Sequence, residues 1–144
     1  MRITDLTQCG VEPILDKVMA FAEARHRVLA ENIANIDTPG YRAKHLDPRL
    51  FQAKLLEAVR ERSAKASGPV ALDSTNQFHT DEQGMLRVTP VLKPPQNVLF
   101  HDGTNASLER QMAELAENAL MYQVAVELRR QRSALVKQAI AGRL

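Results

Sequence analysis

The sequence predicts a mainly α-helical protein whose long N- and C-terminal helices pair as a coiled coil. Apolar residues recur at helical spacing near both ends of the chain, whereas the middle is rich in proline and glycine. Hydrophobic residues make up 44% of the 144 residues, but aromatic residues only 4%, so the apolar content is mostly helix-favouring Ala and Leu. Since the best-patterned helices lie at the two ends, we expect a subunit that completes its core against neighbours rather than an enzyme.

The N-terminal helix is expected to begin near Val11 or Pro13 and to end at about 35–37. Proline is well tolerated in a first helical turn, and Pro39 disfavours the helical conformation at Thr38. The apolar face of this helix comprises Leu15, Val18, Ala22, Leu29, Ile33 and Ile36. The segment 38–41 has proline and glycine at the two central positions of a type II turn.

A shorter helix is predicted over 48–63, because Asp47 can cap it and Pro48 suits its first position. The following segment, 64–103, contains four of the seven prolines and is predicted to be irregular. It has room for one short β-hairpin, because residues 85–89 alternate in polarity and 98–100 form a second apolar run.

The C-terminal helix is predicted over about 108–140 and has the clearest periodicity in the chain. A seam of alternating four- and three-residue steps runs through Leu108, Met112, Leu115, Ala119, Tyr122, Val126, Arg129, Ser133, Val136 and Ile140. We expect Leu115, Tyr122 and Val126 to lie buried between helices, and Glu114 and Glu117 to face outward or toward another subunit. The first half of this helix is acidic and the second half basic, which complements the helix dipole.

These patterns divide the chain into three segments. Residues 1–47 hold the first helix and the turn, 48–103 the short helix and the loop-rich middle, and 104–144 the last helix. The first and third segments are expected to form one core domain.

The residues that carry chemistry do not converge on a predicted site. The four histidines are scattered, Cys9 is the single cysteine, and no glycine-rich phosphate loop is present, so we expect no metal, cofactor or small-molecule substrate. Residues 129–132 form the one basic cluster. A charged helix C-terminus explains it better than nucleic-acid binding, because no aromatic residue interleaves with it and the net charge is only +2.

The end of the first helix resembles the signature of the rod and hook axial proteins of the bacterial flagellum. The residues that carry the resemblance are Leu29, Ala30, Asn32, Ile33, Ala34, Asn35, Asp37, Thr38, Pro39, Gly40 and Tyr41. The continuation over 42–47 and the block at 102–122 resemble the proximal rod branch of that family more than its C rod branch. The resemblance covers about 11–47 and 102–142.

This resemblance implies a structural subunit of the rod, which crosses the periplasm and transmits motor torque to the hook. Such proteins pass through the flagellar type III export apparatus without a cleaved signal peptide, and they have no catalytic residues or cofactor. Their terminal helices form a coiled coil that lines the assembly. Their partners are copies of themselves, other rod proteins and the inner-membrane ring.

Overall fold

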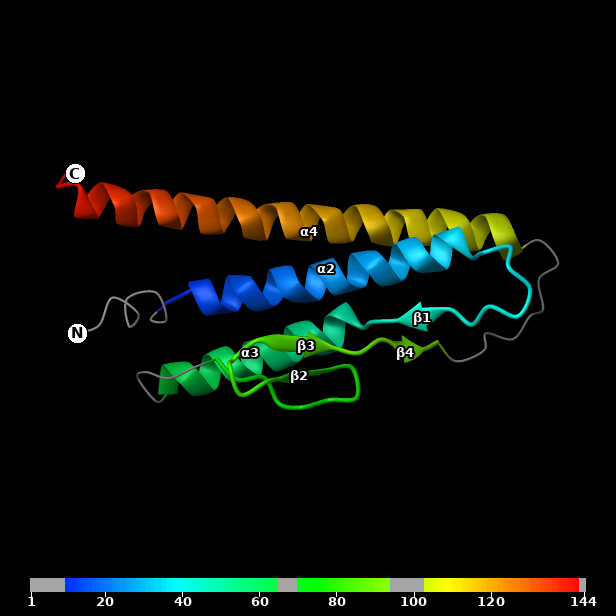
Figure 1. Cartoon of the computed structure of the whole chain (residues 1–144), viewed down its shortest axis with the longest axis horizontal. Helices are drawn as coiled ribbons and strands as arrows, with labels where there is room; N and C mark the ends of the chain where they lie inside the picture. Colours follow the sequence, from blue (N-terminus) through cyan, green and yellow to red (C-terminus); the bar gives the residue numbers. More distant parts are fainter. Residues whose placement is uncertain (1–9, 65–69, 94–102, 143–144) are drawn as a thin grey trace.

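The computed structural model describes residues 10–64, 70–93 and 103–142, and its three helices confirm the predicted fold class. They are α2 (Glu12–Ala34), α3 (Pro48–Ala64) and α4 (Gly103–Ile140). The backbone N–H groups of Arg49 and Leu50 donate to Asp47 Oδ1 at 2.8 and 3.4 Å, so Asp47 caps α3 as expected. Figure 1 shows α2 antiparallel to α4 on one side, with α3 and the strands in a layer on the other side.

Two small antiparallel sheets fill the middle of the chain. Strand β1 (Lys44–His45) pairs with β4 (Val91–Leu92), and β2 (Phe78–Thr80) pairs with β3 (Leu86–Val88). The alternating run at 85–89 is therefore a strand, and 78–80 is the partner that completes the hairpin. The second run proposed at 98–100 lies outside the described residues.

The turn of the β2–β3 hairpin is organised by one carboxylate. Asp81 Oδ1 accepts the backbone N–H groups of Met85 and Gln83 at 2.8 and 3.0 Å, and its Oδ2 accepts from Arg87 at 3.0 Å. These bonds, chiefly the one from Met85, hold the pKa of Asp81 below its usual value. Lys17 of α2 donates to the carbonyl oxygen of Gly84 at 2.5 Å, which fastens the turn to the helix.

The hydrophobic core lies between α2, α3 and this hairpin, and three phenylalanines form its centre. The rings of Phe21 and Phe51 stack with centroids 4.1 Å apart. Phe78 meets both rings edge-on at 6.3 and 5.7 Å. Because each ring comes from a different element, the few aromatic residues join all three elements. The other buried members of this cluster are Val28, Leu46, Ala58, Val70 and Leu72.

The pairing of α2 with α4 uses a face of α4 that differs from the predicted seam. Among residues 108–140 of α4, Asn118 and Ala125 are the buried ones, and Asn118 Nδ2 donates to the carbonyl oxygen of Ala22 at 2.8 Å. The expectation that Tyr122 and Val126 are buried is wrong for the single chain, where they are 40% and 39% exposed. The helix presents the row one position earlier, where Ala125 is buried and the Asn118 amide bonds to the backbone of α2.

Candidate assembly site

The predicted turn after α2 forms as expected. The backbone N–H of Tyr41 donates to the carbonyl oxygen of Thr38 at 3.2 Å, and Gly40 has a φ of 77°. A bond between the first and fourth residues with positive φ at the third is the geometry of a type II turn. A Cβ added at Gly40 would meet no atom within 4 Å, so the backbone conformation alone requires glycine here.

Asn32 joins α2 to the segment that follows the turn. Its Nδ2 donates to the carbonyl oxygen of Lys44 at 2.8 Å, and its Oδ1 accepts the backbone N–H of the same residue at 3.0 Å. The hydroxyl of Tyr41 donates to the same Oδ1 at 3.0 Å. The buried amide thus pairs with the backbone of β1 much as a neighbouring strand would.

A partly exposed ion pair between Lys44 and Glu31 also joins β1 to α2. Lys44 Nζ lies 2.6 Å from Glu31 Oε1, and this hydrogen bond raises the pKa of Lys44. Burial, followed by the charge of Glu31, raises the pKa of Tyr41 above its ordinary value.

The remaining signature residues divide into an inner and an outer group. Asn35 lies at the C-cap of α2, where its Nδ2 donates to the carbonyl oxygen of Glu31 at 2.8 Å. The backbone N–H of Thr38 donates to the carbonyl oxygen of Asn35 at 3.0 Å. Asp37, Thr38, Pro39 and Gly40 are exposed. The exposed residues 38–40 form the turn together with Tyr41, and a role of the exposed residues in subunit contacts stays a prediction.

Ion pairs flank the α2–α4 contact along its length. Arg129 Nη1 lies 2.9 Å from Asp16 Oδ1, and Arg132 Nε lies 4.0 Å from Glu12 Oε1. Two of the arginines in the basic cluster therefore face acidic residues of α2, as expected for a structural role. Glu114 was expected to face outward or toward another subunit, but it is half-buried and lies 3.8 Å from the guanidinium of Arg25 in the same chain.

The predicted seam on α4 is largely exposed in the single chain. Leu108, Leu115 and Ala119 are half-buried, whereas Met112, Tyr122, Val126, Val136 and Ile140 are exposed. Leu120, Val124, Leu128 and Leu135 add further exposed apolar side chains on the same helix. A helix that is apolar on several faces normally lies buried in a larger structure, so this surface is the strongest candidate for subunit contacts.

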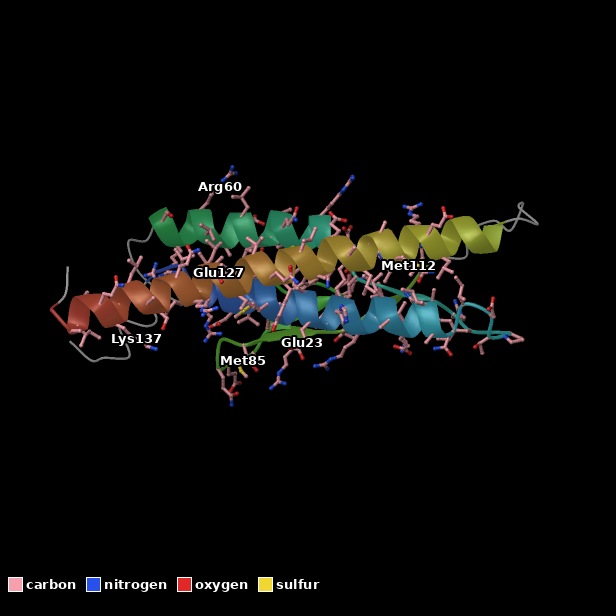
Figure 2. The ribbon with its side chains drawn as sticks, turned by 90° about the horizontal axis from the view of Figure 1, so that it is seen from above. Glu23, Arg60, Met85, Met112, Glu127 and Lys137 are labelled. Atoms are coloured by element: carbon pink, nitrogen blue, oxygen red, sulfur yellow. The ribbon has the colours of Figure 1, made fainter. Side chains whose placement is uncertain are left out.

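The C-terminal end of α4 extends past the beginning of α2. Arg132 already lies beside Glu12, and Ile140, two turns further on, is 82% exposed. Figure 1 shows this overhang, and Figure 2, seen from above, shows α4 crossing in front of α2.

Two clefts of about 290 Å³ each border the α2–α4 contact. One lies beside the signature turn and is lined by residues including Arg25, Asn32, Tyr41, Lys44 and Glu114. The other is lined by Ala22, Glu23, His26, Asn118, Ala119, Tyr122 and Gln123. The second cleft opens next to the exposed seam.

The described residues contain no group of three or more His, Cys, Asp or Glu side chains placed to hold a metal ion. Within the same residues, no helix is both long and apolar enough to cross a bilayer.

Several residues important to the structure were not found by sequence reasoning. Lys17, Gln77 and Asn118 are polar but buried, and each donates or accepts at the backbone of a distant segment. Asn118 and Lys17 lie at helical spacing from apolar neighbours, which is the one signal that the sequence offers for them.

The chain is similar in sequence to known flagellar proteins. A family model described as flagella basal body rod protein matches residues 20–42, which include the signature turn. The flagellar basal body rod protein FlgB of Escherichia coli (strain K12) is 37% identical over 105 residues, which cover 71% of this chain and 72% of that protein. FlgB of Cereibacter sphaeroides is 31% identical over 127 residues (88% and 90%), and FlgB of Bacillus subtilis is 27% identical over 116 residues (78% and 79%).

Proposed function

The chain belongs to the FlgB family of flagellar basal body rod proteins, and we propose from this premise that its terminal helices join it to neighbouring rod subunits. It is a structural subunit of the bacterial flagellar rod. The relatives described above favour neither the C rod protein nor a helical nucleic-acid-binding protein, the two alternatives that the sequence left open.

The observation that supports assembly through α4 is its exposed apolar surface. Tyr122, Val126 and Ile140 belong to a helix of 38 residues, and α2, with 23 residues, covers only one of its faces. Removing this apolar surface from water in a subunit contact would stabilise the contact by about 25 cal/mol per Å². A heterologous contact joins one face of a subunit to a different face of the next. Such contacts propagate into a helical structure, which is the form of a rod.

The partners follow from membership in the family. We expect this chain to contact copies of itself, other rod proteins and the inner-membrane ring, and to transmit motor torque through many such contacts. We expect it to reach the periplasmic rod through the flagellar type III apparatus without a cleaved signal peptide. The family is structural, and we expect no catalysis, no cofactor and no small-molecule substrate.

The test of this function is the location of the protein. We would insert a small epitope tag in the 64–69 segment, which leaves the sequences of both terminal helices unchanged. We expect the tagged chain to support motility and to be present in purified basal bodies. A functional tagged chain that is absent from washed basal bodies would contradict the proposal.

A further inference from the structure

The cleft beside the signature turn carries more positive than negative charge. It lies between α2, α4 and the segment that contains β1, and its volume is about 290 Å³. Its charged lining comprises Arg25, Arg42, Lys44 and Lys93 against the single carboxylate of Glu114. Val28, Leu29 and Leu46 form its apolar part. A recess of this size holds one or two side chains rather than a larger ligand.

The positive charges of this cleft are only partly neutralised. Lys44 is paired with Glu31, but the contact between Arg25 and Glu114 is 3.8 Å, beyond a normal hydrogen bond. Within the part of the chain that the structure describes, the side chains of Arg42 and Lys93 have no ion-pair partner. Because the Arg25 guanidinium is buried, a further carboxylate here would meet a partly desolvated cation, where charge-assisted bonds are strongest.

The β2–β3 turn offers a complementary group on a different surface of the molecule. Glu82 is exposed, and no ion pair engages it within the described residues. Met85, in the same turn, is 54% exposed, and Figure 2 shows its side chain pointing away from the helices. The bonds of Asp81 and Lys17 hold this turn in a fixed shape. The turn therefore presents a carboxylate and an apolar side chain together.

We propose that the β2–β3 turn of one copy of this chain inserts Glu82 into the cleft of the next copy, where the carboxylate meets Arg42 and Lys93. The contact rests on the proposed role as a rod subunit, since it joins one subunit to another. Glu109 and Glu117 are also exposed, but they lie along a helix, and a side chain on a turn enters a recess more readily.

The positions of the two surfaces fit an extending assembly. The turn is fastened to α2 at Lys17, and the cleft reaches Asn32 at the other end of the same helix. At 1.5 Å per residue, these points lie about 20 Å apart along the axis. Two different surfaces at opposite ends give a heterologous contact, which repeats from copy to copy and does not close on itself as a twofold dimer does.

Chemical cross-linking in basal bodies tests this contact. In a Cys9→Ser background, cells express the chain with Arg42→Cys and Glu82→Cys, both at exposed positions, and a short bis-maleimide is applied. We expect dimers and higher multimers of the chain. Two chains that carry one cysteine each, expressed together, should give dimers only, because each then offers one reactive surface. Arg42→Cys with Glu117→Cys is the matched control and should give no multimers.

A charge exchange provides the second readout. Arg42→Glu or Glu82→Lys alone should reduce swarming, and the double variant should restore it in part, because Lys93 remains in the cleft. The contact is overturned if the chain is present in basal bodies but the Arg42–Glu82 pair does not cross-link, or if the Glu117 pair cross-links in its place. Absence of the wild-type chain from basal bodies would instead contradict the proposed function.

Discussion

At the scale of single residues, Asn32 and Gly40 decide how the chain leaves α2. Asn32 supplies both a donor and an acceptor to the backbone of Lys44, and Gly40 supplies the positive φ that reverses the chain. Both lie in the segment matched by the family model. Within the single chain, these two signature residues therefore fix β1 against the helix.

Replacing Asn32 with Ala should lower the free energy of unfolding by about 1–3 kcal/mol, because the N–H and carbonyl groups of Lys44 lose their buried partners. Urea unfolding followed by circular dichroism measures the change. Asn76→Ala removes the same group at an exposed position and is the control. Equal effects of the two substitutions would show that the Asn32 bonds contribute little.

Gly40→Val should be strained by roughly 1–2 kcal/mol, because a β-branched residue tolerates a φ of 77° poorly. Gly40→Asn, which adopts such conformations more readily, is the matched control. We expect Val to impair basal-body incorporation and motility at unchanged export, and Asn to retain both. Normal motility of Gly40→Val at normal expression would refute the role assigned to the turn.

Lys17 predicts a pH dependence of stability. Burial lowers its pKa below 10.5, against the opposing effect of Asp81, so between the folded-state pKa and 10.5 the unfolded chain binds more protons. The free energy of unfolding of the wild type should therefore rise with pH in this window relative to Lys17→Met. Urea unfolding gives the free energy of unfolding of both chains at each pH. Both chains contain Tyr41, so its contribution cancels in the difference between the two profiles. Parallel profiles would contradict the assigned shift.

At the scale of elements, local signals set the ends of the helices well. Pro13, Pro39 and the Asp47–Pro48 pair mark boundaries that the structure confirms within one or two residues. These residues act through their own backbone geometry or a capping bond, which depend little on distant parts of the chain. The start of α4 was predicted too late, because 103–107 lacks the apolar periodicity on which the prediction relied.

The face that α4 turns toward α2 could not be read from the sequence. Leu120, Val124 and Leu128 lie outside the predicted seam and are as apolar as its members, so periodicity alone does not select one row. In the structure the row that contains Asn118 and Ala125 is the buried one, and Asn118 bonds to the backbone of Ala22. In the same way, the hairpin strand 78–80 depends on the Asp81 turn and the burial of Phe78, which no local pattern reveals.

The overhang of α4 predicts uneven protection from hydrogen exchange. In the dilute single chain, amides of 134–140 should exchange faster than those of 115–126, because the latter pack against α2, whereas the side chains of 134–140 are exposed. Exchange followed by mass spectrometry resolves the two segments. Equal, strong protection of both in a proven monomer would show that the overhang is stable without neighbours.

At the scale of the whole molecule, the core and the surface that we propose for assembly are separate. The three phenylalanines close the core on one side of α2, and the exposed apolar row of α4 lies on the other. A change on α4 outside the α2 contact should therefore spare the fold of the single chain and still affect the rod. The ends of the chain identified the family, but only the folded arrangement shows which apolar residues the single chain leaves uncovered.

The most direct test of this account compares two adjacent positions on α4. Ala125→Asp places a charge in the buried contact with α2 and should destabilise the chain by several kcal/mol, whereas Val126→Asp should change stability by far less. Glu117→Gln is the control for an exposed change. The decisive measurement is incorporation into basal bodies at matched export. We predict that Val126→Asp folds like the wild type but is excluded from the rod, and incorporation at the wild-type level would contradict assembly through the exposed face of α4.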